Sequence, residues 1–323
     1  MSFSDIKGQD RAISFLKASI ANNRVSHAYI FWGPGGIGKA LTALNFAKAL
    51  NCENKGENMP CDQCASCKRI TSSNHPDIFL IKPQKDENSD IGIDRIREMI
   101  KDITLKPYGA RKKVYIIDGA GGMTQDAQNA LLKTLEEPPS ESVLILLTEF
   151  LSGLLPTIQS RGQAVKFFAL GIDEVRRILV EEYKIDNINA NILAYLSSGR
   201  LGEALLYRGA HLLEKRSWVI KALADKTLFD SDFDRLSRKD LKFYLDVMLT
   251  WYRDILIAKT RSSGKTPLVN IDKEDIILSE SKTCEVGELG DIIKQIILTN
   301  FFLEQNANPK LAIAALGANI CMK

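Results

Sequence analysis

Five short runs made up mainly of hydrophobic residues divide the first half of the chain. They lie at residues 28–32, 77–81, 114–118, 143–147 and 164–168. Hydrophobic residues at helical spacing occupy segments between them, most clearly 38–50, 93–103 and 124–136. Apolar runs without alternation are typical of parallel strands covered on both faces, and their alternation with helices indicates an α/β architecture. The pattern therefore predicts an α/β domain with a parallel sheet that ends near residue 168.

After residue 168 the strand patterns stop. Residues 172–207 have the spacing of short helices, and 240–260 and 288–305 have that of long ones. We therefore expect a small helical domain at about 169–209 and an all-α C-terminal domain at about 210–323.

Composition narrows the class of protein only moderately. The chain has 323 residues, of which 45% are hydrophobic and 26% charged, as in ordinary globular proteins. The net charge of +3 does not by itself indicate a nucleic-acid partner. The N-terminal residues lack the apolar core of a signal peptide, and no run approaches 18 apolar residues. We expect a cytoplasmic protein.

A glycine-rich motif follows the first predicted strand directly. It reads Gly33-Pro34-Gly35-Gly36-Ile37-Gly38-Lys39 and fits the phosphate-loop pattern G-x-x-x-x-G-K between a strand and a helix. Glycines allow backbone N–H groups to surround a phosphate, and the lysine reaches the terminal phosphates. The motif predicts a nucleotide site. The alternative is a glycine-rich turn without a ligand.

Two positions around this motif lack the groups that ATP hydrolysis needs. Ala40 follows the lysine, where the motif has a Ser or Thr hydroxyl that binds Mg²⁺. The strand 114–118 ends in Asp118, in the magnesium position, but Gly119 stands where a catalytic carboxylate is expected. We expect hydrolysis to be badly impaired, and whether nucleotide still binds stays open.

Four of the six cysteines lie close together in the sequence. They are Cys52, Cys61, Cys64 and Cys67, and two residues separate successive members of the last three. This spacing allows four thiolates to converge on one tetrahedral Zn²⁺ in a closed, structural site. An iron–sulfur cluster uses similar spacing and is the main alternative.

Several motifs occur in the order seen in one family. They are HAYIFWGPGGIGK (27–39), the cysteine cluster, HPDIF (75–79), VYIID (114–118), NALLKTLEEPP (129–139) and SRG (160–162). On these motifs the chain resembles the bacterial clamp-loader group of the AAA+ superfamily, which includes the tau/gamma and delta-prime subunits of DNA polymerase III. The resemblance implies a RecA-like AAA+ domain at 1–168 with a zinc module at 52–67. It further implies a helical lid at 169–209 and a C-terminal collar at 210–323.

The departures from the family pattern point to one type of subunit. Tau/gamma subunits carry a hydroxyl after the lysine, an Asp-Glu pair and an arginine in the lid. Here those positions are Ala40, Asp118-Gly119 and Gly202. All three depart toward the delta-prime type, which does not hydrolyse ATP. Arg200 lies two residues before Gly202, and whether it replaces the lost lid arginine is an open question.

The family's Ser-Arg-Cys motif appears here as Ser160-Arg161-Gly162. The resemblance implies that Arg161 acts in trans as an arginine finger at the ATP site of a neighbouring subunit. The alternative is a surface arginine that forms a salt bridge. Thr148 stands where the family places a residue that senses the γ-phosphate, and it is either a relic or the cap of a strand end.

The resemblance implies a subunit of the DNA polymerase III holoenzyme with little or no ATPase activity of its own. It implies assembly with tau/gamma and delta subunits, and contact with the sliding clamp and primer–template DNA through the complex. Two alternatives remain at this point. One is an active ATPase of the tau/gamma type, and the other is a zinc-containing nucleic-acid-binding module.

Overall fold

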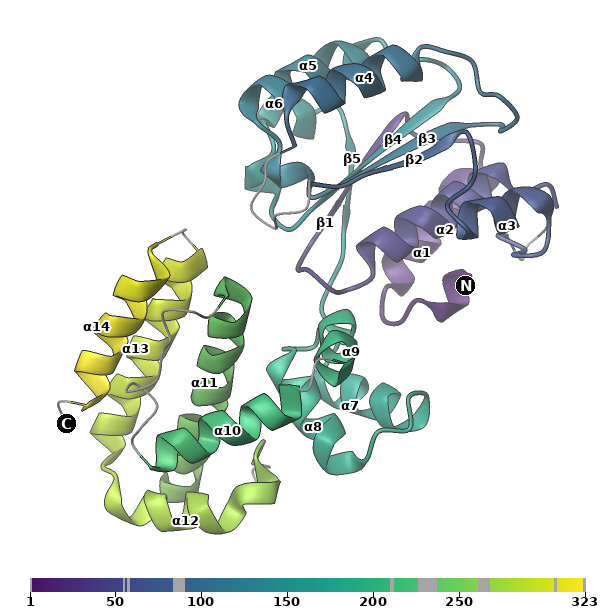
Figure 1. The fold of residues 1–323 in the computed structure, drawn as a ribbon. Helices are drawn as coiled ribbons and strands as arrows, with labels where there is room; N and C mark the ends of the chain where they lie inside the picture. Colours follow the sequence, from purple (N-terminus) through teal and green to yellow (C-terminus); the bar gives the residue numbers. More distant parts are fainter. Residues whose placement is uncertain are drawn as a thin grey trace. The chain divides into compact units, whose positions relative to one another are not determined.

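A computed structural model describes residues 2–54, 56, 59–83, 91–209, 212–225, 237–260, 268–304 and 307–321 of the chain. The chain divides into two compact units, Met1–Leu170 and Gly171–Lys323. The first holds a β-sheet and the second is helical in its described residues (Figure 1). No helix in these described ranges has the length and hydropathy needed to cross a membrane.

The sheet of the first unit has five parallel strands. They are β1 (Ala28–Trp32), β2 (Ile78–Ile81), β3 (Lys113–Asp118), β4 (Ser142–Thr148) and β5 (Gln163–Lys166). Their order is β2-β3-β4-β1-β5, and Ile30 of the inner strand β1 lies opposite Leu146 and Ala164. The predicted parallel sheet is confirmed, and so is the helical nature of the remainder.

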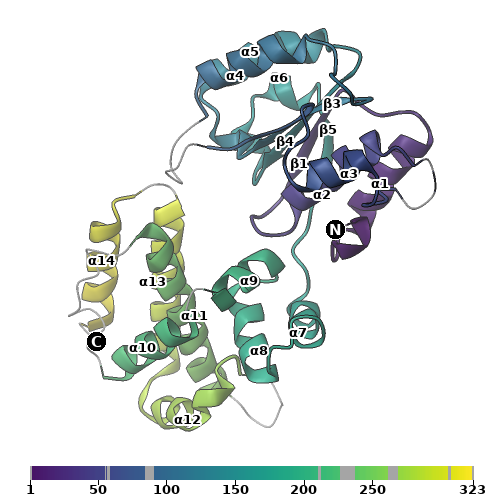
Figure 2. The same cartoon turned by 45° about the vertical axis from the view of Figure 1, so that its right-hand side comes forward.

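Helices cover both faces of this sheet (Figures 1 and 2). They are α1 (Asp10–Ala21), α2 (Lys39–Asn51) and α3 (Ala65–Thr71) on one side, and α4 (Ile93–Ile103), α5 (Gln125–Glu136) and α6 (Pro156–Gln159) on the other. Neighbouring residues of β1 serve the two sides: Phe31 belongs to the core that includes α1 and α2, and Ile30 to the core that includes α4 and α5. Both faces are therefore buried, which explains why the strands show no polar alternation.

The second unit is built from eight α-helices in the described ranges. They are α7 (Ile172–Glu181), α8 (Asn187–Leu196), α9 (Leu201–Gly209), α10 (Leu212–Ala224), α11 (Arg238–Thr260), α12 (Glu274–Thr283), α13 (Val286–Glu304) and α14 (Pro309–Cys321). Short 3-10 turns lie at Phe3–Asp5, Ala120–Gly122, Leu151–Gly153 and Ile271–Lys273.

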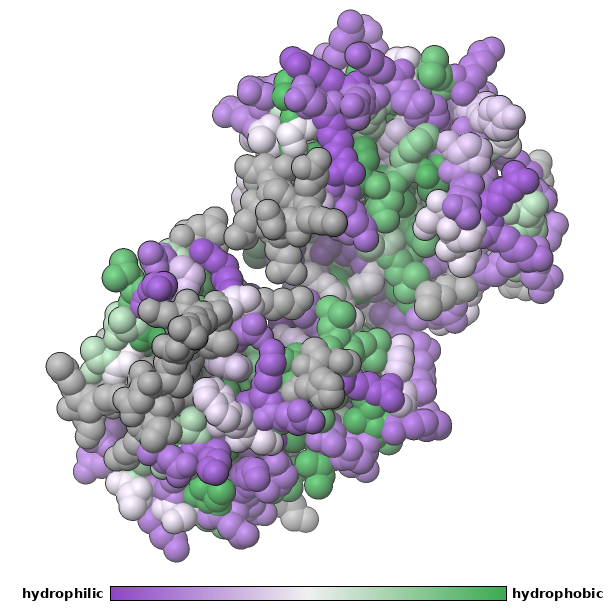
Figure 3. All heavy atoms as spheres, in the orientation of Figure 1, coloured by the Kyte–Doolittle hydropathy of each residue, from purple (hydrophilic) through white to green (hydrophobic). Residues whose placement is uncertain are grey.

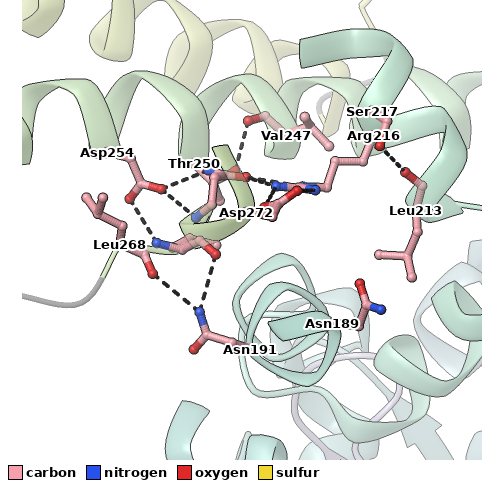
Figure 4. A network of polar contacts seen from close by, with 12 residues as sticks. Asn189, Asn191, Leu213, Arg216, Ser217, Val247, Thr250, Asp254, Leu268 and Asp272 are labelled. Carbon is pink, nitrogen blue, oxygen red and sulfur yellow. Dashed lines mark hydrogen bonds and ion pairs between the residues drawn. The ribbon is translucent and has the colours of Figure 1, made fainter. Parts of the chain in front are cut away.

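A buried polar network ties the helices of the second unit together (Figure 4). Arg216 of α10 donates to Asn270 and forms an ion pair with Asp272, at 2.7 Å to each. Asp254 of α11 is fully buried and accepts hydrogen bonds from the backbone N–H groups of Val269 and Asn270. Asn191 of α8 donates to the carbonyl of Val269. The network therefore links α8 to the helices that follow residue 209, and the predicted boundary between a lid and a collar at 209/210 stays a prediction.

Candidate functional site

The phosphate loop connects the end of β1 to the start of α2. Its backbone is left-handed at Gly33, Gly36 and Gly38, where φ is 143°, 70° and 95°. A Cβ on Gly33 would lie 2.4 Å from the carbonyl oxygen of Phe167, so no other residue fits there without a shift of the backbone. The loop therefore has the curled backbone that the motif predicts.

Lys39 begins α2 and points back into the loop. Its ammonium group donates to the carbonyl oxygens of Gly33 and, at 2.6 Å, of Pro34. Burial lowers the pKa of Lys39, while the charges of Glu149 and Asp118 act in the opposite direction. The loop's own carbonyl oxygens thus serve as the hydrogen-bond acceptors of the Lys39 ammonium. A bound phosphate would compete with these carbonyls for the ammonium.

A cavity of about 270 Å³ opens beside the loop. Its lining includes Gly35, Gly36, Gly38, Lys39, Ala40, Asp118, Gly119, Thr148 and Glu149. The structure thus brings five of the six predicted nucleotide-site residues to one pocket, and the sixth, Gly33, lies in the same loop. The two departures, Ala40 and Gly119, face the same space. They therefore lie where hydrolysis would need a hydroxyl and a carboxylate.

Gly119 lacks the carboxylate side chain expected at this position, and its backbone conformation is also unfavourable for a residue with a side chain. Its φ of 79° and ψ of 33° are left-handed, and a Cβ there would lie 3.3 Å from Pro83. A glutamate at this position would carry about 1–2 kcal/mol of backbone strain. Thr148 directs its hydroxyl to the carbonyl oxygen of Phe150 at 2.9 Å, which is a contact expected of a strand-end cap.

Glu149 is a pocket residue that the motif analysis missed. It follows Thr148 at the carboxyl end of β4, beside β1, and its carboxylate would lie 2.7 Å from a Cβ on Gly35. A signal was present in the sequence, since polar residues after neighbouring parallel strands gather at one edge of a sheet. The pocket therefore has two carboxylates, those of Asp118 and Glu149, against one lysine.

Arg161 does not line this pocket and lies at a corner between α5 and α6, here called the Arg161 corner (Gln128, Glu136, Thr157, Gln159, Ser160 and Arg161). Its guanidinium Nη2 lies 2.8 Å from a carboxylate oxygen of Glu136. Its Nη1 donates to the carbonyl oxygen of Thr157 at 2.9 Å and contacts the Ser160 hydroxyl at 3.3 Å. With 34% of its side chain exposed, Arg161 is both oriented and open to a partner.

Two glutamines hold the backbone of this corner. Gln128 of α5 is buried, donates to the carbonyl oxygen of Gly153 at 3.1 Å and accepts from the N–H of Leu155 at 2.8 Å. Gln159 donates to the carbonyl oxygens of Leu151 and Leu154, at 2.8 Å each. The Gln128 side chain therefore fixes the turn that leads to Arg161 to α5, and the Gln159 side chain closes that turn on itself.

Gly162, which stands in place of the family's cysteine, lies against the core. A Cβ at this position would lie 2.7 Å from Cγ1 and 2.8 Å from Cδ1 of Ile30. Ile30 is fully buried in β1. The isoleucine thus occupies the space that a side chain at 162 would need, which explains the departure from the family motif by packing.

The four predicted metal ligands come together in the structure. One sulfur from each of Cys52, Cys61, Cys64 and Cys67 lies within 4.8 Å of the other three. Sulfurs on a tetrahedral Zn²⁺ are about 3.8 Å apart, given Zn–S bonds of about 2.3 Å. Cys52 caps the end of α2, and Cys64 caps the start of α3. The cluster can therefore hold a metal ion after a small contraction.

The thiols of this cluster lie in different environments. The backbone N–H groups of Cys64 and Gln63 lower the pKa of Cys61 to about 6, whereas burial raises the pKa of Cys52 and of Cys67. Four thiolates at this separation repel one another and lose hydration. A divalent cation removes both costs, so the donor set fits a thiolate-binding metal.

His75 and Asp77, from the HPDIF motif, organise the fold near the cluster. His75 accepts a hydrogen bond at Nδ1 from the N–H of Asp77, and it is not among the cysteine ligands. Asp77 is 1% exposed and accepts from the N–H groups of Tyr108, Gly109 and Ala110 at 2.7–2.9 Å. Burial alone would raise the pKa of Asp77, but these three bonds bring it below its usual value. The motif therefore fixes a turn before β3.

Comparison with known proteins shows which family the chain is similar to. Residues 8–170 match the family described as DNA polymerase III, delta subunit. The chain is 34% identical over 269 residues to DNA polymerase III subunit delta' of Bacillus subtilis, with 80% of each chain covered. It is 28% identical over 349 residues to the tau subunit of the same organism, covering 99% of this chain but 61% of that one.

Relatives of the tau type are longer than this chain. Over 208 residues the chain is 34% identical to the tau subunit of Escherichia coli, which covers 63% of this chain and 32% of that subunit. Among solved structures, a gamma-subunit-related protein of Thermotoga maritima aligns over 96% of this chain and 98% of its own length, with 19% identity and a TM-score of 0.47.

Proposed function

The chain belongs to the DNA polymerase III delta-subunit family, and from this membership we propose that it is a delta-prime-type clamp-loader subunit that supplies Arg161 to a neighbour's ATP. It would help to load the sliding clamp onto primer–template DNA as part of the polymerase holoenzyme, in the cytoplasm. The observation that carries the proposal is the contrast between a phosphate pocket without its catalytic groups and an Arg161 held ready at the surface.

The proposed chemistry of Arg161 is electrostatic. A guanidinium beside the γ-phosphate offsets the negative charge that develops during hydrolysis, and arginine fingers accelerate related reactions about 10³–10⁵-fold. The backbone and side-chain contacts of Arg161 lower the entropy lost when it engages a phosphate. The alternative is an arginine that serves only a surface salt bridge. It accounts for the contact with Glu136 but not for the further hydrogen bond that orients the guanidinium toward Thr157.

The chain's own pocket is proposed to bind nucleotide weakly or not at all and to hydrolyse little or none. Its glycine cradle and Lys39 are intact, and a phosphate can replace the loop carbonyls as partner of the ammonium. Glu149 and Asp118 oppose a polyanion, and Ala40 cannot hold Mg²⁺. Arg200 donates to the carbonyl oxygen of Ser197 within its own unit, and a role for it at a nucleotide stays open.

The cysteine cluster is proposed to hold a structural Zn²⁺. Four thiolates leave the ion no open position for catalysis, so the bound ion would fix the segment between α2 and α3. An iron–sulfur cluster is the alternative for the same ligands. Nothing in the proposed function involves electron transfer, which favours zinc.

The second unit is proposed to provide a lid at about 169–209 and a collar at about 210–323 that assembles with tau/gamma and delta subunits. Exposed apolar residues support this assembly. Ile297, Leu298, Phe301 and Phe302 of α13 and Leu311 of α14 are each more than a third exposed. Hydrophobic side chains are visible at the surface over these two helices in Figure 3. Such residues are typical of protein–protein contacts.

Reconstitution tests the proposal. The chain is mixed with a tau/gamma-type motor subunit and a delta subunit, and clamp-stimulated ATP turnover is measured with wild type and with Arg161→Ala. The wild-type chain should increase ATP turnover by the complex, and we expect this increment in turnover to be lost with Arg161→Ala. Equal turnover with both proteins would refute the role in trans.

An active ATPase of the tau/gamma type is the second candidate, favoured by the 99% coverage in the match to the tau subunit. It predicts ATP turnover by the isolated chain that Lys39→Ala abolishes. A zinc-containing nucleic-acid-binding module instead predicts tight, salt-sensitive DNA binding without partner subunits.

A further inference from the structure

Glu136 stands out because its charge lies in an electrostatically unfavourable place. It is the last residue of α5, and Glu137 follows it. The carbonyl end of a helix carries partial negative charge, so two acidic residues there oppose the helix dipole.

The charge of Glu136 is balanced by Arg161. The carboxylate oxygen of Glu136 lies 2.8 Å from Nη2 of the guanidinium, at the distance of a charge-assisted hydrogen bond. Glu137 makes no side-chain hydrogen bond or ion pair in the described part of the chain, although it is exposed in the same way. The two neighbouring acids therefore form a natural pair of test and control.

The contacts of Arg161 leave part of its guanidinium free. A guanidinium has five N–H donors. Contacts to Thr157, Ser160 and Glu136 engage Nη1 and one side of Nη2. Nε and the second hydrogen of Nη2 have no acceptor among the residues that the structure describes. The guanidinium is thus oriented without losing its ability to bind a phosphate.

Glu136 and Arg161 are also tied to one framework. Gln128, two helical turns before Glu136 on α5, holds Gly153 and Leu155, which lead into α6 and Arg161. The corner is therefore attached to α5 at two points. The Gln128 side chain forms hydrogen bonds with its backbone, and Glu136 forms the ion pair with Arg161. Such double support is typical of side chains that must be placed accurately.

We propose that Glu136 is a positioning residue, which orders the Arg161 guanidinium before a neighbouring subunit presents its ATP. This inference rests on the role in trans proposed above. The side chains of Arg161 and Glu136 are 34% and 52% exposed, so solvent weakens their attraction. Exposed ion pairs of this kind are worth about a two- to five-fold change in an equilibrium, which sets the size of the expected effect.

The test uses the complex of this chain with the motor and delta subunits. In Glu136→Ala we expect the turnover number of the increment due to this chain to fall about two- to five-fold, with the KM for ATP unchanged. Glu136→Gln should lie between wild type and alanine, because an amide oxygen accepts the hydrogen bond without the charge. Glu137→Ala should match wild type.

The outcomes separate this inference from the proposed function. Loss of the increment in Arg161→Ala together with wild-type turnover in Glu136→Ala would refute the positioning role and leave the role in trans standing. Wild-type turnover in Arg161→Ala would refute both. Faster turnover in Glu136→Ala would show that the carboxylate restrains Arg161, and would also overturn the inference. Glu136 and Glu137 are exposed and Arg161 is partly exposed, and thermal melting of each variant checks that it folds.

Discussion

The phosphate pocket and the Arg161 corner lie in the same α/β unit but differ in what remains of their chemistry. In the pocket the backbone cradle is intact, yet Ala40 and Gly119 lack polar side chains, and Lys39 is bonded to the loop's own carbonyls. At the corner the charged group is present and each element around it is held by side-chain hydrogen bonds. The comparison shows that the backbone of a phosphate loop can be complete although the side chains that hydrolysis needs are absent beside it.

Loss of the proposed metal ion should have the largest effect, and the effect should be confined to the side of the sheet that carries α2 and α3. α2 starts with Lys39 and is followed by Cys52, so the cluster anchors the far end of the helix that carries the lysine. Structural zinc binding contributes about 10 kcal/mol or more in zinc-finger peptides. We expect Cys64→Ser to lose its metal by elemental analysis and to raise hydrogen exchange in α3.

In the same experiment, exchange in α5 and α6 should stay as in wild type, and Cys284→Ser should have no effect on metal content. Unchanged exchange in α3 after loss of the metal would contradict a structural role for the cluster.

Asp77→Ala should destabilise the first unit by about 3 kcal/mol, because three backbone N–H groups lose a buried acceptor. Chemical denaturation measures this, with the exposed Asp94→Ala as control. The pKa of Asp77 is lower in the folded state, so its contribution is complete above the unfolded pKa of about 4 and is lost as the pH falls further. The difference in free energy of unfolding between wild type and Asp77→Ala should therefore become smaller below about pH 4. A difference that is constant with pH would refute the charge-based account.

Gly162→Cys should cost about 1–3 kcal/mol of stability, because the new side chain overlaps Ile30. The same change should cost less in an Ile30→Ala background, where the space is open, and a double-mutant cycle measures this coupling. Gly92→Ala, which meets no atom within 4 Å, is the control. Additive effects of Gly162→Cys and Ile30→Ala would show that Ile30 does not explain the glycine.

Restoring the pocket's missing groups should have the smallest effect on activity. Ala40→Ser alone should change stability by less than about 0.5 kcal/mol and give no turnover by the isolated chain. Ala40→Ser with Gly119→Glu should also stay inactive, and should lose about 1–2 kcal/mol through strain at the left-handed residue 119. ATP turnover by the double variant would contradict this account, because it would show that the missing side chains alone, and not the backbone at residue 119, prevent hydrolysis.

The regular elements were largely predictable because burial on both faces leaves a strong signal. The strand predicted at 143–147 is observed at Ser142–Thr148, and the helix at 240–260 is observed at Arg238–Thr260. The last strand, predicted at 164–168, is observed at Gln163–Lys166, where only Val165 is buried. Helix α12 was missed because it starts within a stretch that is polar in sequence and has only two buried residues.

The site was predictable where a motif marks it, and not where packing creates it. Lys39, Asp118 and Arg161 follow from motifs. The contacts of Gln128 with Gly153, and of Glu136 with Arg161, join residues 25 positions apart, and only the fold brings them together. No local sequence pattern predicts such contacts. Two glutamates at the C-terminal end of a helix are unfavourable there, however, and this indicates that one of them has a cationic partner.

The measurement that tests the contrast most directly compares Lys39→Ala and Arg161→Ala in the same reconstituted clamp loader. ATP turnover is measured with the clamp and primer–template DNA present. The account predicts that Arg161→Ala loses the increment due to this chain, whereas Lys39→Ala keeps it. Loss of turnover in Lys39→Ala with wild-type turnover in Arg161→Ala would contradict the account, because the working chemistry would then lie in the chain's own pocket.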